Sequence, residues 1–238
     1  MAKIISIHQP NFFPWLGYFD KIIKSDYFIF LDDVQFPKKG GNWVNRVKLL
    51  IQGEERWITA KVDRSYHGTR DINEIKVVDN QIWQKKIIKT LSQNYSKHEF
   101  FTEIMMFIEN LLVNDEKYLS KYNSNNIISI LKKLELDSSK CFFSSDINLI
   151  NFKSNERLIH LVKSLKGDTY LCGGGSMNYQ NDELFFENNL NIKYQKYAHP
   201  KYTQNGSGEF ISGLSIIDCL MNLGFERTSS LLLENSRL

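Results

Sequence analysis

The sequence predicts an α/β protein with a parallel or mixed central sheet flanked by helices, a β-hairpin insertion and a helical middle segment. Three observations support this fold class. Short apolar runs alternate with a helical pattern in the first thirty-odd residues, residues 46–62 have the pattern of a hairpin, and strands and helices alternate again after Cys141. Because the chain has no internal repeat or low-complexity linker, we expect a single domain over residues 1–238, with a helical subregion at about 80–136.

The N-terminal residues have the size of a β-α-β unit. A β-branched run at 4–7 stops at His8, residues 15–24 carry apolar positions at helical spacing, and a second apolar run covers 27–31. The loops after His8 and Leu31 are therefore expected at the same carboxyl edge of a parallel sheet, where ligands bind in open α/β folds.

The other elements are predicted from periodicity and turn residues. They are strands at 46–51 and 56–62 around a turn at 52–53, helices at 80–95, 101–113 and 115–136, a strand at 140–144, a helix at 154–166, a strand at 169–171, a helical stretch from about 179, a strand at 191–197, and a helix at 214–223 that ends at Gly224.

Composition excludes several classes of protein. Lys and Arg total 30 against 27 for Asp and Glu, so the net charge of +3 is too small for a general nucleic-acid coat. No apolar stretch is long enough for a secretory signal or a membrane span, which indicates a cytoplasmic protein. Three cysteines without C-x-x-C spacing predict free thiols, and no metal-ligand spacing occurs.

The first candidate site is the loop that follows the first strand. Pro10 restricts the backbone, so His8, Gln9 and Asn11 are held in place. A histidine at the end of a strand can carry a proton or bind phosphate. The alternative is a histidine whose hydrogen bonds are satisfied by the backbone of a tight turn.

The second candidate is the adjacent pair Asp32 and Asp33, which follows the second strand. Neighbouring carboxylates after a buried strand point to different sides, so one can face a ligand while the other orients the loop. Either carboxylate would serve as a general base or bind a sugar hydroxyl or ammonium group. The alternative is a pair of turn residues that bond local amides.

The third candidate combines Asn42, Trp43, Asn45 and Arg46. The arginine fork suits phosphate or carboxylate, and the indole offers a stacking face for a base or sugar. The alternative places Trp43 in the core and pairs Arg46 with Asp32 or Asp33.

A glycine run and a long loop complete the candidates for substrate binding. Gly173, Gly174 and Gly175 follow a predicted strand and would let backbone N–H groups approach an anion, although their spacing matches neither a Rossmann fingerprint nor a Walker A loop. His199 begins a polar loop long enough to act as a lid.

Several of these segments resemble the WbqC-like protein family. The similar segments are 7–21, 31–36, 42–46, 156–159, 170–174 and 214–218. The resemblance implies that His8, Gln9, Asp32, Asp33, Asn45 and Arg46 belong to the family signature. Cys172 occupies a position where members commonly have Ser, which argues against an essential hydroxyl nucleophile there.

The resemblance also implies a role in bacterial surface polysaccharides such as O-antigen or capsule. We expect a transferase that acylates or aminoacylates a nucleotide-linked amino sugar, with His8, Asp32 or Asp33 as base and Arg46 and the glycine run on phosphate. The expected acyl donor is a coenzyme A or carrier-protein thioester, and the expected partners are the activated sugar and a second copy or another pathway enzyme. The alternatives are a nucleotide-dependent activating enzyme and a non-catalytic sugar-binding or scaffold subunit.

Overall fold

Five parallel strands form the central sheet of the computed structural model, which describes residues 2–37, 42–79, 81–147, 149, 152–174, 180–206 and 208–237. The strands lie in the order β5-β2-β1-β6-β7, and every neighbouring pair is parallel. Their bounds are β1 Ile4–His8, β2 Tyr27–Phe30, β5 Cys141–Phe143, β6 Thr169–Gly173 and β7 Asn191–Gln195. The strand order changes direction between β1 and β6, which makes this the switch point of the sheet.

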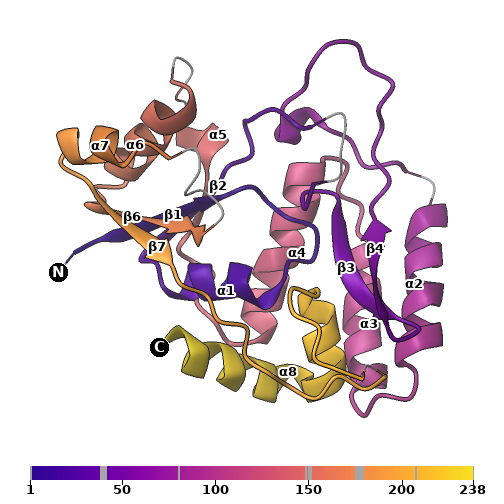
Figure 1. Cartoon of the computed structure of the whole chain (residues 1–238). Helices are drawn as coiled ribbons and strands as arrows, with labels where there is room; N and C mark the ends of the chain where they lie inside the picture. Colours follow the sequence, from indigo (N-terminus) through magenta and orange to yellow (C-terminus); the bar gives the residue numbers. More distant parts are fainter. Residues whose placement is uncertain are drawn as a thin grey trace.

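Helices cover both faces of the sheet, and a separate hairpin packs beside it (Figure 1). The helices are α1 Leu16–Ile23, α2 Ile82–Tyr95, α3 Phe101–Leu112, α4 Leu119–Lys133, α5 Ser144–Ile147, α6 Ser154–Ser164, α7 Asp182–Glu187 and α8 Ile216–Ser236, with a short 3-10 helix, η1, at Ile72–Glu74. The hairpin consists of β3 Arg46–Ile51 and β4 Glu54–Thr59.

Alternation along the strands divides the core into two parts. Ile5, Ile7 and Ile29 point to the face covered by α6 and α7, where they form the smaller apolar cluster. Phe28 and Phe30 point to the opposite face and join the larger cluster. Because successive side chains of a strand face opposite sides, both sheet faces are apolar, as expected for a parallel sheet buried by helices.

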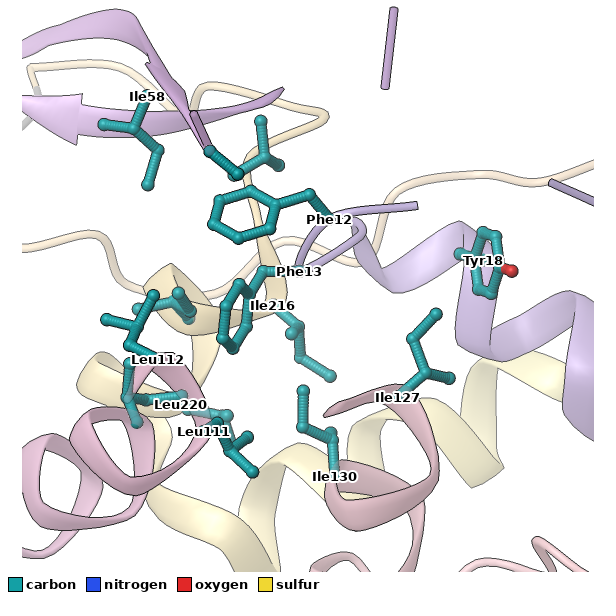
Figure 2. Close-up of a cluster of buried hydrophobic side chains, with 14 of the residues drawn as sticks. Phe12, Phe13, Tyr18, Ile58, Leu111, Leu112, Ile127, Ile130, Ile216 and Leu220 are labelled. Carbon is teal, nitrogen blue, oxygen red and sulfur yellow. The ribbon is translucent and has the colours of Figure 1, made fainter. Parts of the chain in front are cut away.

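The larger cluster fixes the loop between β1 and α1. Phe12 and Phe13 are fully buried, and Figure 2 shows their rings among side chains of α3, α4 and α8. Asn123 of α4 donates hydrogen bonds from its side-chain amide to the Pro10 and Val44 carbonyls, at 2.8 and 2.6 Å. The loop between β1 and α1, which carries the first candidate residues, is therefore held by its buried apolar rings and by the hydrogen bonds of the Asn123 amide.

The structure confirms the predicted fold class: a parallel sheet flanked by helices, a hairpin and a helical middle segment. The last helix was predicted to end at Gly224, and the structure shows an interruption there but not the end of the helical region. The backbone leaves the helical region there, with φ 71°, but a second helical segment continues to Ser236. The second hairpin strand ends earlier than predicted because Val62 bridges Val77 instead.

Two further expectations concern cysteines and membranes. Cys141, Cys172 and Cys219 form no disulfide bond. In the part of the chain that the structure describes, no helix has both the length and the apolar character needed to cross a membrane.

Candidate functional site

The carboxyl edge of the sheet brings the first candidates together. His8 is the last residue of β1 and Gly173 the last of β6, so they end the two strands on either side of the switch point. The backbone N–H of Leu31 donates to the His8 carbonyl, at 2.9 Å, which places the loop of Asp32 directly beside β1. Ligands of open α/β sheets bind outside the strand ends at this point.

His8 is a neutral imidazole with a defined tautomer. Its Nδ1 lies 3.1 Å from the Gln9 carbonyl oxygen, and because a carbonyl can only accept, Nδ1 carries the proton and Nε2 presents a lone pair. Burial, together with the charge of Lys21, lowers the pKa of His8 to about 3. The side chain is therefore a weak base at neutral pH and acts as a hydrogen-bond acceptor rather than a proton carrier.

Lys21 lies buried beneath β1. Its ammonium group donates to the Ile7 carbonyl at 2.9 Å, and among the described residues no carboxylate pairs with it. The neighbouring carboxylate of Asp20 instead contacts Lys24 at 3.2 Å and accepts from Gln195 at 2.7 Å. Burial lowers the pKa of Lys21 to about 8. A buried ammonium with one carbonyl partner is costly, and this one lies next to the strand end that carries His8.

Four rings form a continuous contact path, here called the aromatic row: His8, Trp15, Trp43 and Trp57. The ring centroids of His8 and Trp15 are 6.1 Å apart, and each of the following pairs is separated by 4.9 Å. Arg46 places its guanidinium group 4.0 Å from the Trp57 ring centroid. The row links the end of β1 to the hairpin and ends on a stacked cation.

Sequence reasoning missed Trp57, although hairpin pairing contains the signal. In the β3–β4 register Lys48 faces Trp57 and Arg46 faces Thr59. Arg46 and Trp57 are therefore diagonal neighbours on one face of the ribbon, within reach of long side chains. Trp57 is 39% exposed, so the end of the row is open to a ligand.

Tyr197 and His199 lie in the segment that packs on Gly17, beside Trp15 of the row. They follow β7, and their ring centroids lie 4.7 Å apart. The backbone N–H of Gly213 donates to His199 Nδ1 at 3.4 Å. Tyr197 packs on Gly17: a Cβ added there would lie 2.8 Å from the tyrosine ring and 2.7 Å from Trp15 Nε1. Gly17 therefore permits the contact between α1, the row and the segment after β7.

Replacing Gly17 with Ala is expected to displace Trp15 and to destabilise the fold by about 1–3 kcal/mol, because the added methyl group has no space. Urea unfolding followed by tryptophan fluorescence measures both effects. Gly208→Ala is the matched control, since an added Cβ meets nothing within 4 Å there. Equal stability of the two variants would contradict the tight contact.

Asp32 is buried and fully hydrogen-bonded. Its carboxylate accepts from the hydroxyls of Ser120 and Ser145, at 3.2 and 3.0 Å, and from the Ser145 backbone N–H at 3.1 Å. These donors come from α4 and from α5. Asp32 therefore connects the edge loops, and both of its carboxylate oxygens are occupied by donors of the protein.

Asp33 faces the other side of the sheet edge, as expected for adjacent carboxylates. It accepts from Ser144 and forms an ion pair with Arg157 of α6. Arg157 also donates to the Leu149 carbonyl, at 3.2 Å. The suggested pairing of Arg46 with an aspartate was wrong: Arg157, 124 positions further along the chain, is the partner of Asp33.

The remaining predicted residues have mainly local contacts. Asn42 accepts from the Val44 N–H at 2.9 Å, and Asn45 donates to the Ala60 carbonyl at 3.2 Å, so both shape the entry to the hairpin. Asn11 is buried, and its side-chain NH2 group finds no partner among the described residues.

The glycine run and Gln9 complete this set. The Gln9 carbonyl also accepts from the Tyr18 hydroxyl at 2.9 Å. Gly173 and Gly174 lie at the end of β6, while Gly175 lies outside the described residues.

Asp218, near the chain's end, belongs to a different network. Its buried carboxylate accepts from the hydroxyls of Tyr95 and Tyr202, at 2.8 and 2.7 Å. Burial raises the pKa of this carboxyl group. The network joins α2, α8 and the segment after β7, so Asp218 has a structural role away from the row.

Together these features define an open α/β protein in which His8, Asp32 and Asp33 lie at the carboxyl edge of a five-stranded parallel sheet. The chain belongs to the WbqC-like protein family, whose model matches residues 9–230. It is 29% identical over 225 residues to "Uncharacterized protein Rv1507c" of Mycobacterium tuberculosis, across 94% of this chain and 95% of that protein. No solved structure matches it.

Proposed function

We propose that the chain is a transferase of bacterial O-antigen or capsule biosynthesis, which binds a nucleotide-linked amino sugar and adds an acyl or aminoacyl group to its amine. Membership of the WbqC-like family supports the pathway. The observation that carries the choice of substrate is the aromatic row with Arg46 stacked on its open end. We place the reaction in the cytoplasm, where nucleotide-linked sugars are available.

The row and Arg46 match the two parts of such a substrate. Indole faces stack on bases and sugar rings, and the guanidinium fork binds phosphate oxygens. Arg46 Nε is buried and has no hydrogen-bond partner among the described residues. The row begins at His8, on the switch point where open α/β sheets bind nucleotides.

In this proposal the chain acts mainly by positioning. The sugar amine donates a hydrogen bond to His8 Nε2, which fixes its lone pair for attack on the thioester carbonyl. A C–N bond forms and the C–S bond breaks, and the thiol leaves with the amine proton. Because the pKa of His8 is about 3, the imidazole orients the amine without removing its proton beforehand.

Calorimetric titration with UDP-, dTDP- and GDP-linked amino sugars tests the binding step. Arg46→Met is expected to weaken binding at least about tenfold, because it removes a charge-assisted hydrogen bond to phosphate. Arg56→Met is the matched control on the same hairpin: Arg56 is exposed and paired with Glu54. No binding by the unmodified chain, or equal losses in both variants, would overturn the proposal.

A second candidate is nucleotide-dependent activation of a carboxylic acid. The observation that favours it is the state of the three predicted catalytic groups: the carboxylates of Asp32 and Asp33 are occupied by donors of the protein, and His8 is a neutral imidazole with a low pKa. Attack of a carboxylate on the α-phosphate of a nucleoside triphosphate releases pyrophosphate and needs no proton transfer to the protein.

Product analysis separates the candidates. Pyrophosphate release with a nucleoside triphosphate and a carboxylic acid would establish the second. Free thiol release from an acyl thioester in the presence of the amino sugar would establish the first. Sugar binding without either product would indicate the non-catalytic subunit.

A further inference from the structure

The segment between β7 and α8 contains the one Asn-Gly pair of the sequence, Asn205 and Gly206. Both residues are exposed and form a turn. Just before the pair, the buried side-chain amide of Gln204 donates to the Ile211 carbonyl and accepts from the Ile211 N–H, each at 2.8 Å. The pair is therefore presented to water in a loop whose base is closed by two hydrogen bonds.

The side-chain amide of Asn205 and the backbone nitrogen of Gly206 are both free of hydrogen bonds within the described part of the chain. The Asn205 backbone N–H donates to Asn222 Oδ1 of α8 at 3.0 Å, but the side-chain amide has no partner there. The Gly206 N–H has none either. Because glycine has no Cβ, its nitrogen is also unshielded by a side chain of its own residue. The two groups can therefore approach each other without breaking a contact of the fold.

Asn94 shows the opposite arrangement. Its side-chain oxygen accepts from the Gln52 N–H at 3.0 Å, and its side-chain NH2 group donates to the Thr90 carbonyl at 2.8 Å. The residue that follows is Tyr95, the last residue of α2. An asparagine held in this way cannot bring its side chain onto the next backbone nitrogen unless those bonds break.

We propose that Asn205 is a site of spontaneous deamidation in the folded chain. The Gly206 nitrogen attacks Cγ of Asn205, a C–N bond forms, and the bond from Cγ to Nδ2 breaks, so that ammonia leaves with the proton of the Gly206 nitrogen. Water, the one co-reactant, then opens the cyclic imide at either carbonyl and gives aspartate or isoaspartate. The inference goes beyond the proposed function and is independent of it.

The reaction would alter a contact between the hairpin and α8. Either product adds a negative charge to the loop, and isoaspartate also lengthens the backbone by a methylene group. The change falls between the bond of the Asn205 N–H to Asn222 and the Gly206 carbonyl oxygen, which lies 3.2 Å from the position that a Cβ on Gly53 of the hairpin turn would take. The bonds at the base of the loop lie outside it. We therefore expect the modified chain to keep its fold.

The experiment incubates the full chain at pH 7 and at pH 9, folded and in guanidinium chloride, and follows each asparagine by peptide mass spectrometry. Conversion of Asn205 should be faster at the higher pH, because the deprotonated backbone nitrogen is the attacking species. The folded chain should react within a few-fold of the unfolded one, since no local unfolding is needed. Asn189 and Asn191, which are also exposed but precede Leu and Ile, should react at least about tenfold more slowly.

Two variants test the assignment. Asn205→Gln should slow the conversion at this position at least about tenfold, because the added methylene group makes the ring larger and its closure less favourable. Asn189→Gln, at another exposed asparagine, should convert at Asn205 as the unmodified chain does. Persistence of the Asn205 amide in the folded chain under conditions that convert it in the unfolded chain, or equal conversion at Asn189 and Asn205, would overturn the inference.

Discussion

Replacing Lys21 with Met is expected to stabilise the folded chain by about 3 kcal/mol at pH 7, taking about 1.4 kcal/mol for each unit of pKa shift. The lysine is 2% exposed, and its pKa falls from 10.5 to about 8 on folding. Methionine has a similar length and needs no hydrogen bonds. The substitution therefore removes the cost of a buried ammonium while it keeps the packing.

The pH dependence gives this prediction a clear sign. Below about pH 8 the lysine is protonated in both states, so the cost is fully present. Between about 8 and 10.5 the unfolded chain holds more protons than the folded one, and stability rises with pH. The advantage of Lys21→Met should therefore shrink across this interval.

Urea unfolding at several pH values measures the change. Lys132→Met, at an exposed position, serves as control and should change stability by no more than about 0.5 kcal/mol. A clear loss of stability in Lys21→Met would show that the bond to the Ile7 carbonyl outweighs the cost of the charge.

Replacing Arg157 with Met is expected to destabilise the fold by about 3 kcal/mol, the range measured when one partner of a buried pair is removed. Arg157 and Asp33 are only 13% and 18% exposed, so the remaining carboxylate would keep little contact with water. Chemical unfolding of the variant at neutral pH measures the loss.

A double-mutant cycle distinguishes the pair from other effects of the substitution. Asp33→Asn in the Arg157→Met background should recover part of the lost stability, because the uncompensated charge is gone. Additive losses in the double variant would mean that Arg157 acts through its bonds to the Leu149 and Phe152 carbonyls instead.

Local patterns predict the fold because they report which face of each element is buried. The β-α-β unit follows from a β-branched run, a helical apolar pattern and a second run, and these patterns alone predict that His8 and Asp32 share one sheet edge. Gly224 shows the limit of this reasoning. A glycine predicts a helix end, but at Gly224 the backbone, with φ 71°, only interrupts the helix. The Phe100 ring occupies the space that a side chain at position 224 would need.

The site was less predictable because its contacts are distant in sequence. Trp15, Trp43 and Trp57 meet only when the hairpin folds over the first loop. Arg157 reaches Asp33 from α6, which covers the face of the sheet with the smaller apolar cluster. No periodicity specifies such pairs; they depend on how complete elements pack.

The contact between Ser215 and the first loop bears on the order of folding. The Ser215 hydroxyl donates to the Phe13 carbonyl at 2.7 Å, across 202 positions, and the Ile216 N–H donates to the Pro14 carbonyl at 2.9 Å. Contacts of this separation form late, since they close a very long loop. During synthesis β1 and α1 therefore emerge before residues 215–216, and the backbone next to His8 gains these two supports only after those later residues have been made.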